Sequence, residues 1–199
     1  MQDITILIPA AGASRRMRGS DKLLEPVGGV SVLRRTADIA AGTGAKVVVT
    51  LPDTGPILPA RRATLVGSTA RLILIKDAHE GMAASLRAGA REAGQTEALM
   101  VMLPDNPDIE ASDLALMLTA FKEDPTVALR AATGGGTPGH PVIFPRRLFQ
   151  ELTVLTGDRG GRIVLADENV RSCPLPGRRA VTDLDTPEDW AVWRKESGR

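Results

Sequence analysis

Short apolar runs alternate with longer segments of helical spacing, and this alternation constrains the fold more than any other feature. The β-type runs cover residues 4–8, 46–51, 72–75 and 98–103. Helical patterns lie between them at 32–41, where Ser31 is the expected N-cap, and at 82–93. Nearly continuous apolar strands are typical of a sheet covered on both faces. The pattern therefore predicts an α/β fold with a central parallel sheet and right-handed crossovers.

The pattern loosens after residue 103. A helix is expected over 111–121, followed by a strand over 127–131 and a glycine-rich stretch at 134–139. We interpret this part as an insertion over the sheet within a single domain, 1–199. Thr186 starts a capping box with a proline behind it, which predicts a last helix that packs through Trp190 and Trp193.

Composition excludes several classes of protein. The 199 residues include 25 Lys and Arg and 24 Asp and Glu, so the net charge is too small to give an overall electrostatic field that attracts nucleic acid or an anionic membrane. No apolar run reaches the roughly 18 residues of a membrane span, and the opening segment is too short for a signal peptide, so a cytoplasmic location is expected. The single Cys173 excludes an internal disulfide framework, and nothing beside it in the sequence marks it as a nucleophile.

The loop after the first apolar run carries the features of an anion site. Small residues at 9–14 are followed by four cations within eight positions, at Arg15, Arg16, Arg18 and Lys22. Small side chains let backbone N–H groups approach phosphate oxygens, and the cations neutralise their charge. The loop matches neither the P-loop nor the dinucleotide glycine pattern, which argues against a nicotinamide-dependent oxidoreductase. A basic surface loop is the plainer alternative.

Acidic residues follow the fourth apolar run and precede the last helix. Asp105 lies where a strand is expected to end, and Asp183 and Asp185 alternate, so they would point the same way in an extended segment. Sparse carboxylates that act together with substrate phosphates suit Mg²⁺. The alternatives are a Pro-Asp-Asn-Pro turn at Asp105 and acids that complement the positive end of a helix.

Other polar clusters are weaker signals. Residues 80–85 precede a helix with small side chains, and residues 157–162 form a polar loop. His140 is one of two histidines and either contacts a substrate or satisfies a local hydrogen bond.

Together, the ordered segments resemble the MobA-like nucleotidyltransferase family, and especially its molybdenum cofactor cytidylyltransferase branch. The resemblance covers nearly the whole chain. It rests on AAGASRRM (10–17) with Lys22, EGMAAS (80–85), LPDNP (103–107), GHPV (139–142), GDRG (157–160) and DLDTPED (183–189).

The resemblance implies a Rossmann-like three-layer sandwich with a mostly parallel sheet, which joins a nucleotide to a phosphate-bearing acceptor with Mg²⁺ and releases pyrophosphate. By position, Arg16, Lys22 and Asp105 would be catalytic, Asp105 would share the metal with Asp183 or Asp185, and His140 would touch the acceptor. The implied nucleotide-binding set is Pro9, Ala10, Ala11, Gly12, Ser14, Arg16, Lys22, Gly81, Met82 and Ser85.

The resemblance also indicates the substrates. Residues 9–12 read PAAG, the form of the cytidylyl branch, where the guanylyl branch typically has LAGG. The implied substrates are therefore CTP and molybdenum-bearing molybdopterin, with transient contact to a molybdenum hydroxylase or its chaperone. Two positions depart from the pattern that the resemblance implies. Arg18 stands where a glycine is frequent, and Asn106 stands where a Met or Gln is usual. Asn106 is expected to lie close enough to the metal to affect its bound waters.

Two alternatives stay open. One is the same fold with GTP or with another phosphorylated acceptor, such as a sugar phosphate. The other is a domain without transfer activity that senses nucleotide or delivers cofactor to an apoenzyme. The combination of Arg16, Lys22 and Asp105 argues against the second, because a binding module has less need of a metal ligand.

Overall fold

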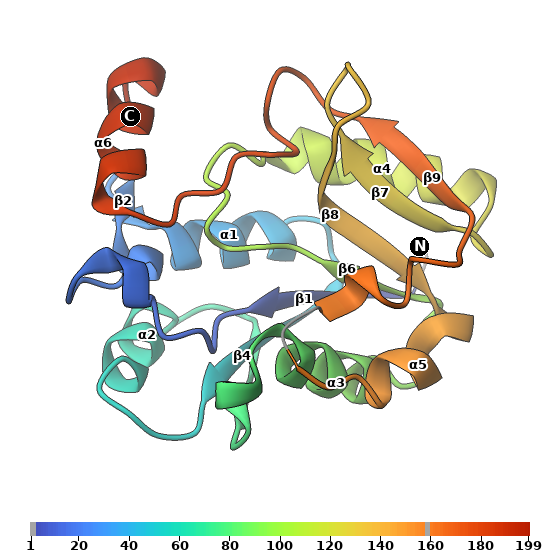
Figure 1. Cartoon of the computed structure of the whole chain (residues 1–199), viewed down its shortest axis with the longest axis horizontal. Helices are drawn as coiled ribbons and strands as arrows, with labels where there is room; N and C mark the ends of the chain where they lie inside the picture. The colour runs from blue at the N-terminus through green and yellow to red at the C-terminus, as the bar shows by residue number, and fades with distance from the viewer. Residues whose placement is uncertain (1–2, 158–159) are drawn as a thin grey trace.

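A seven-stranded sheet organises the protein. The structure is a computed structural model that describes residues 3–157 and 160–199, and its strand order is β5-β4-β1-β6-β8-β7-β9 (Figure 1). The strands of this sheet are β1 Ile4–Pro9, β4 Lys46–Pro52, β5 Arg71–Ile75, β6 Ala98–Val101, β7 Ala128–Ala132, β8 Pro138–Pro145 and β9 Val170–Pro174. A separate small ribbon pairs β2 Pro26–Val27 with β3 Val30–Ser31.

Six α-helices accompany the sheet. They are α1 Val32–Ala41, α2 Leu58–Thr64, α3 Met82–Ala93, α4 Ala111–Glu123, α5 Phe149–Thr153 and α6 Pro187–Ser197. The predicted spans of α1 and α3 are confirmed, and the Ser31 hydroxyl accepts a hydrogen bond from the Arg34 N–H as the N-cap of α1. Figure 1 shows α1 and α4 over one face of the sheet and α3 and α5 over the other, so the predicted three-layer α/β arrangement is confirmed.

The four predicted strands form the parallel half of the sheet. Strands β5, β4, β1 and β6 are all parallel to one another. Strand β6 ends at Val101, two residues before the predicted end, although the Met102 N–H still donates to the Leu7 carbonyl. The carboxyl ends of these strands therefore meet at one edge, where open α/β sheets bind ligands.

The interpretation of the segment after residue 103 as an insertion over the sheet is wrong. Strands β7 and β8 form a hairpin whose second strand pairs antiparallel to β6, and β9 adds to the far edge parallel to β7. The 134–139 glycine-rich stretch contains the turn of this hairpin and the start of β8. Antiparallel pairing with β6 covers an edge that a four-stranded parallel sheet would leave open.

The core lies on both faces of the sheet. Ile6 and Ile8 face α1, whereas Leu7 points to the other side, where a Cβ at Gly89 of α3 would lie 2.4 Å from it. Trp190 and Trp193 of α6 are buried, as predicted, and the Thr186 capping box is confirmed. Within the described chain, no helix is long and apolar enough to cross a membrane.

Helix α2 has no counterpart in the sequence prediction. It has seven residues, no side-chain N-cap, and Ile57 before its first residue. Such a short element has too few turns to establish a helical period against its loop. It carries Arg61 into the interior, with consequences for the site below.

We expect Gly139→Ala to lower the free energy of unfolding by about 1–3 kcal/mol, because a Cβ there would lie 1.8 Å from the Ala180 carbonyl oxygen. Gly134→Ala, in the same hairpin, is the matched control, since a Cβ there meets nothing within 4 Å. Denaturant unfolding of both variants measures the difference. Equal stability of the two variants would contradict the close packing of β8 on the segment that contains Ala180.

Candidate active site at the carboxyl edge of the sheet

The loop after β1 follows a tight path. It contains two short 3₁₀ turns, η1 Arg15–Met17 and η2 Lys22–Leu24, and Ser14 and Arg18 on either side of η1 have φ values of 49° and 51°. Such left-handed conformations cost a non-glycine residue roughly 1–2 kcal/mol. Arg18 thus has a left-handed backbone at the position where the resemblance leads us to expect a glycine.

A buried arginine from α2 holds this loop. The side chain of Arg61 is fully buried and donates to the backbone carbonyls of Ala10 at 2.7 Å and Gly12 at 2.8 Å, to the Ser14 hydroxyl at 3.0 Å, and to both carboxylate oxygens of Asp21 at 2.7 Å. Burial raises the pKa of Asp21, but the hydrogen bonds and charge of Arg61 outweigh this effect and hold it below its ordinary value. We call these contacts of Arg61 with Ala10, Gly12, Ser14 and Asp21 the clasp. The clasp holds the first and last residues of the loop close together.

Sequence reasoning missed Arg61. Nothing in the local pattern separates it from its neighbour Arg62, which is exposed. Only the three-dimensional path of α2 distinguishes the two, so no motif could have identified it.

The segment before α6 is docked on the loop after β6. The Asn106 amide donates to the Arg179 carbonyl at 2.6 Å, the Thr182 hydroxyl donates to Asp108 at 2.7 Å, and the Leu184 N–H donates to the Asp105 carbonyl at 3.2 Å. The side chain of Asn106 therefore anchors this segment; its expected effect on metal-bound water stays a prediction.

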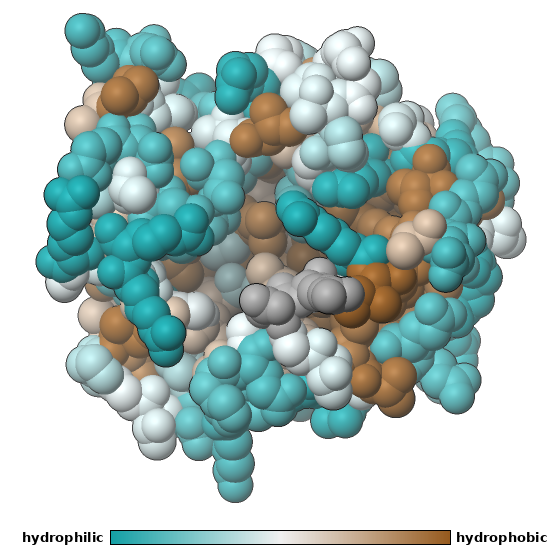
Figure 2. Space-filling model, in the orientation of Figure 1, coloured by the Kyte–Doolittle hydropathy of each residue, from teal (hydrophilic) through white to brown (hydrophobic). Residues whose placement is uncertain are grey.

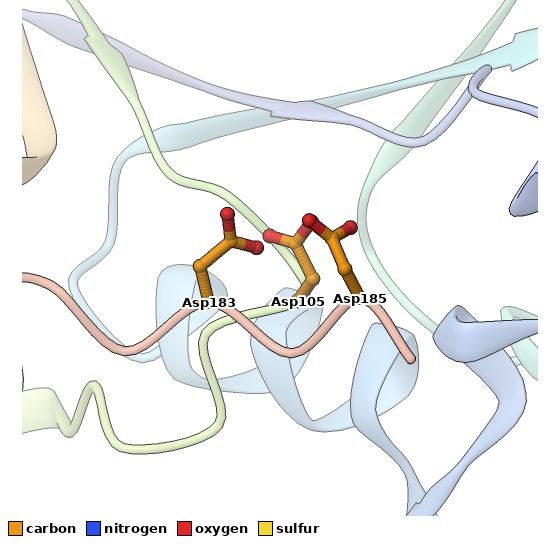
Figure 3. Close-up of side chains that lie close together, drawn as sticks. All are labelled: Asp105, Asp183 and Asp185. Carbon is orange, nitrogen blue, oxygen red and sulfur yellow. The ribbon is translucent and has the colours of Figure 1, made fainter. Parts of the chain in front are cut away.

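This docking brings the three predicted acids together. Asp105, Asp183 and Asp185 each offer a carboxylate oxygen within 4.8 Å of the others. Figure 3 shows the three carboxylates pointing to the same side from two neighbouring loops. Leu184 between the last two points the other way and is buried, as the predicted alternation requires.

Two of the predicted cations neutralise the acids. The Lys22 ammonium lies 2.5 Å from Asp105 and 2.6 Å from Asp185, and Arg16 lies 2.6 Å from the other oxygen of Asp185. Burial lowers the pKa of Lys22, but the two carboxylates outweigh this and raise it above its ordinary value. Arg16, Lys22 and Asp185 line a pocket of about 300 Å³ together with Gly12, Ala13, Ser14 and Arg15.

The acids fit a hard divalent cation. The Oδ1 atom of Asp105 is buried and has no hydrogen-bond partner within the described chain, so a ligand position is available there. Partial burial and the charges of Asp105 and Asp185 raise the pKa of Asp183 to about 6, against the opposite effect of Lys22 and Arg16. Oxygen donors that repel one another in this way are stabilised by a cation.

The other predicted nucleotide contacts fall into two groups. Ala10 and Ala11 are buried and Pro9 is half-buried, so at these positions the loop offers backbone rather than side chain. The hydroxyl of Ser14 donates to Asp21 and accepts from Arg61, which makes it part of the clasp.

The second group lies at the start of α3. Gly81 precedes the helix with φ 73°, and Ser85 is buried and accepts a hydrogen bond from Thr50 at 2.9 Å, which ties α3 to β4. Met82 and His140 lie apart from the pocket of Lys22 and line a larger cavity. Two residues of the 157–160 motif, Asp158 and Arg159, lie outside the described residues.

Cys173 is buried in β9, and burial raises the pKa of its thiol above the ordinary value. A thiol of this kind is mostly protonated at neutral pH and is a poor nucleophile.

The site as a whole combines carboxylates that could hold a metal with cations that could hold an anion. This arrangement is suited to binding and aligning phosphates.

We expect Arg61→Ala to lower the free energy of unfolding by about 3–5 kcal/mol, because it leaves the Asp21 carboxylate without its buried partner. Arg61→Lys is expected to lose less, since a lysine keeps the charge but not the paired hydrogen bonds. The exposed neighbour gives the control, Arg62→Ala, with a change below about 0.5 kcal/mol. Similar denaturant midpoints for Arg61→Ala and Arg62→Ala would refute the clasp.

We expect Mn²⁺ binding to weaken about tenfold between pH 7 and pH 5. Asp183, with a pKa of about 6, takes up a proton as the pH falls through that value, and the metal must then displace it. Calorimetric titration with Mn²⁺ at several pH values measures this. Asp183→Asn should bind more weakly with little change over the same range, and the exposed control Asp3→Asn should behave as the wild type does. An affinity independent of pH in the wild type would exclude Asp183 from the site.

Comparison with known proteins identifies the family. The model of the MobA-like NTP transferase domain matches residues 6–172. Nicotine blue oxidoreductase of Paenarthrobacter nicotinovorans is 24% identical over 168 residues, which cover 81% of this chain and 81% of that protein.

Solved structures agree with the fold. The crystal structure of Rv0371c from Mycobacterium tuberculosis H37Rv is 30% identical with a TM-score of 0.82 and 98% of each chain covered, and its complex with manganese is 29% identical with a TM-score of 0.77 and 96% and 97% covered. CMP:2-keto-3-deoxy-manno-octonic acid synthetase complexed with CTP shares the fold, with 15% identity, a TM-score of 0.76 and 99% of each chain covered. The chain therefore belongs to the family of the MobA-like NTP transferase domain, and it is a nucleotidyltransferase.

Proposed function

We propose that this nucleotidyltransferase transfers CMP from CTP to the phosphate of molybdenum-bearing molybdopterin and releases pyrophosphate. The observation that carries the proposal is the contact of Lys22 with Asp105 and Asp185, in which a phosphate-binding loop meets a candidate metal cluster. The product would be handed to a molybdenum hydroxylase or its chaperone.

The loop after β1 would hold the triphosphate. Arg16 and Lys22 line its pocket, and the backbone of residues 9–14 is available to phosphate oxygens. Without ligands, Arg16 and Lys22 neutralise the charge of the acids. When a metal ion binds Asp105 and Asp185 and neutralises them instead, the two side chains are free to contact the phosphates. The arriving nucleotide and its metal therefore rearrange the same ion pairs.

Mg²⁺, held by Asp105 with Asp183 or Asp185, would supply charge neutralisation at the phosphates. The acceptor phosphate attacks the α-phosphorus of CTP in line, and the bond to the pyrophosphate oxygen breaks. Arg16 and Lys22 stabilise the charge on the leaving pyrophosphate. The chemistry asks for alignment and charge stabilisation, with no covalent nucleophile from the protein.

The choice of CTP rests on the PAAG form of residues 9–12, and the choice of molybdopterin on the order of the motifs. Manganese in the complex of Rv0371c supports a divalent cation. One relative is named nicotine blue oxidoreductase, so a redox activity is the alternative that the experiment has to distinguish. The sequence has no dinucleotide-binding fingerprint, which argues against this alternative.

We expect CTP with Mg²⁺ to raise the unfolding temperature by about 5–10 °C when CTP is present at about 100 times its dissociation constant, which corresponds to about 2.7 kcal/mol. Scans with CTP, GTP, ATP, UTP and NAD at equal concentration test selectivity. Pyrophosphate release with the molybdopterin acceptor then tests transfer, with a loss of at least about 100-fold in Lys22→Ala and Asp105→Asn.

Lys122→Ala, an exposed lysine on α4, is the matched control and should retain the full shift and turnover. A larger shift with GTP would overturn the choice of base. A shift with NAD alone would favour the redox alternative, and CTP binding without turnover would favour the cofactor-delivery alternative.

A further inference from the structure

Helix α6 borders the candidate active site and contacts the loop after β1 at both of its ends. Glu188 in its first turn forms an ion pair with Arg18 at 2.8 Å, and Arg194 in its last turn forms one with Glu25 at 2.5 Å. Figure 2 shows hydrophilic side chains gathered over α6 and this loop, on the left of the view. Ion pairs between exposed side chains, such as Arg18 and Glu188, add little stability. The buried face of α6 therefore decides how firmly the helix is held.

That buried face carries the two tryptophans. The rings of Trp190 and Trp193 meet edge to face, with centroids 5.8 Å apart and an angle of 78° between their planes. The guanidinium of Arg194 lies over the Trp190 ring, 5.2 Å from its centroid. Trp193 is 6% exposed, so packing fixes the direction of its indole N–H. This N–H donates to the Oδ1 atom of Asp108 at 2.9 Å.

Asp108 connects α6 with the segment that carries the last two acids. Its other oxygen, Oδ2, accepts a hydrogen bond from the Thr182 hydroxyl at 2.7 Å. Over residues 3–157 and 160–199, no lysine or arginine forms an ion pair with this half-buried carboxylate, so its two hydrogen bonds go to neutral donors. Hydrogen bonds to a charged acceptor are stronger than those between neutral groups. The carboxylate thus ties Trp193 to the residue directly before Asp183.

Asp183 depends on such an anchor more than the other two acids do. Both of those form ion pairs with Lys22, whereas the Asp183 carboxylate has no hydrogen-bond or ion-pair partner among the described residues. Its position is therefore set by the backbone on either side of it. Thr182 holds that backbone before Asp183, and the Leu184 N–H, which donates to the Asp105 carbonyl at 3.2 Å, holds it after.

We propose that Asp108 is a positioning residue of the metal site. Through Thr182 it sets where the Asp183 carboxylate meets a divalent cation, and through Trp193 it makes that position depend on the docking of α6. The inference rests on the proposed function, because it takes the three acids as metal ligands. It gives the last helix a role in metal binding as well as in packing.

The central test is Thr182→Val, which removes the hydroxyl and nearly keeps the shape of the side chain. We expect the affinity for Mn²⁺, measured by calorimetric titration, to fall about tenfold, as is typical when a residue that orients metal ligands is lost. Thr182→Ser keeps the hydroxyl and should stay within about twofold of the wild type. Neither substitution changes the charge, so weaker electrostatic attraction of the cation cannot explain a loss.

Two further variants test the rest of the chain of contacts. Asp108→Asn should also lose about tenfold, because its amide oxygen accepts only one of the two hydrogen bonds while its NH₂ group faces the other donor. Trp193→Phe keeps an aromatic ring without an N–H. We expect it to lose only about threefold, since Thr182 still has its acceptor.

A double-mutant cycle separates positioning from a merely structural role. In an Asp183→Asn background, Thr182→Val should change the Mn²⁺ affinity less than about twofold, because the ligand that it positions is gone. A structural role would lower the free energy of unfolding in both backgrounds and leave the affinity of the folded protein unchanged. Denaturant unfolding of every variant sets conditions under which each is folded during the titration.

Thr126→Val is the matched control. The Thr126 hydroxyl also donates to an aspartate, Asp124, at 2.6 Å, but it lies before β7. Because β7 runs in the same direction as β6, this position is at the edge of the sheet opposite the acids. Its Mn²⁺ affinity should equal that of the wild type.

The inference is overturned if Thr182→Val binds Mn²⁺ as the wild type does, if Thr182→Ser does not restore binding, or if Thr182→Val weakens binding equally in the Asp183→Asn background. The thermal shift of the wild type with CTP and Mg²⁺ tests the proposed function separately. A shift that depends on Mg²⁺, together with unchanged Mn²⁺ binding by Thr182→Val, would refute the role of Asp108 and leave the proposed function standing. No Mn²⁺ binding by the wild type would overturn the inference whatever CTP does.

Discussion

Lys22 forms ion pairs with Asp105 and Asp185, which lie 83 and 163 residues after it in the sequence, and so connects three distant parts of the chain. The three acids of the cluster would repel one another without nearby positive charge. Lys22 and Arg16 supply that charge, and both belong to the loop after β1. The conformation of this loop and the position of the segment before α6 are thereby coupled. A change in charge at the acids therefore acts directly on Lys22 and Arg16.

Two arrangements outside the cluster hold its parts in place. Arg61 fastens the two ends of the loop after β1 through carbonyls and Asp21, so Lys22 starts from a fixed backbone. On the other side, Asn106 and Asp108 hold the segment that carries the last two acids. The close contact of Gly139 with Ala180 confines that segment further. The charged groups of the cluster thus meet because a buried ion pair, hydrogen bonds and close packing outside the cluster place their backbones.

The sequence predicted what local pattern and strand ends determine. Continuous apolar runs identified the parallel half of the sheet, and Asp183 and Asp185 followed from alternation around Leu184. The strand predicted over 127–131 was assigned to an insertion instead of to the sheet, and β8 was not predicted, because antiparallel pairing with β6 depends on contacts that no local pattern specifies. Arg61 escaped for the same reason, since its burial depends on where a short helix lies. Arg18 shows the converse: the departure from glycine was visible, but its left-handed backbone was not.

Polar and apolar surfaces are separated at the carboxyl edge of the sheet. Cations and small residues surround the pocket on the side of β1, whereas apolar side chains line the cavity on the side of β8. Asp105 interacts with residues of both, because it forms an ion pair with Lys22 and its charge affects the pKa of His140. The pocket and the cavity share no lining residue, and Arg130, His140, Val142 and Phe144 of the β7–β8 hairpin, which the parallel half of the sheet lacks, form part of the cavity wall.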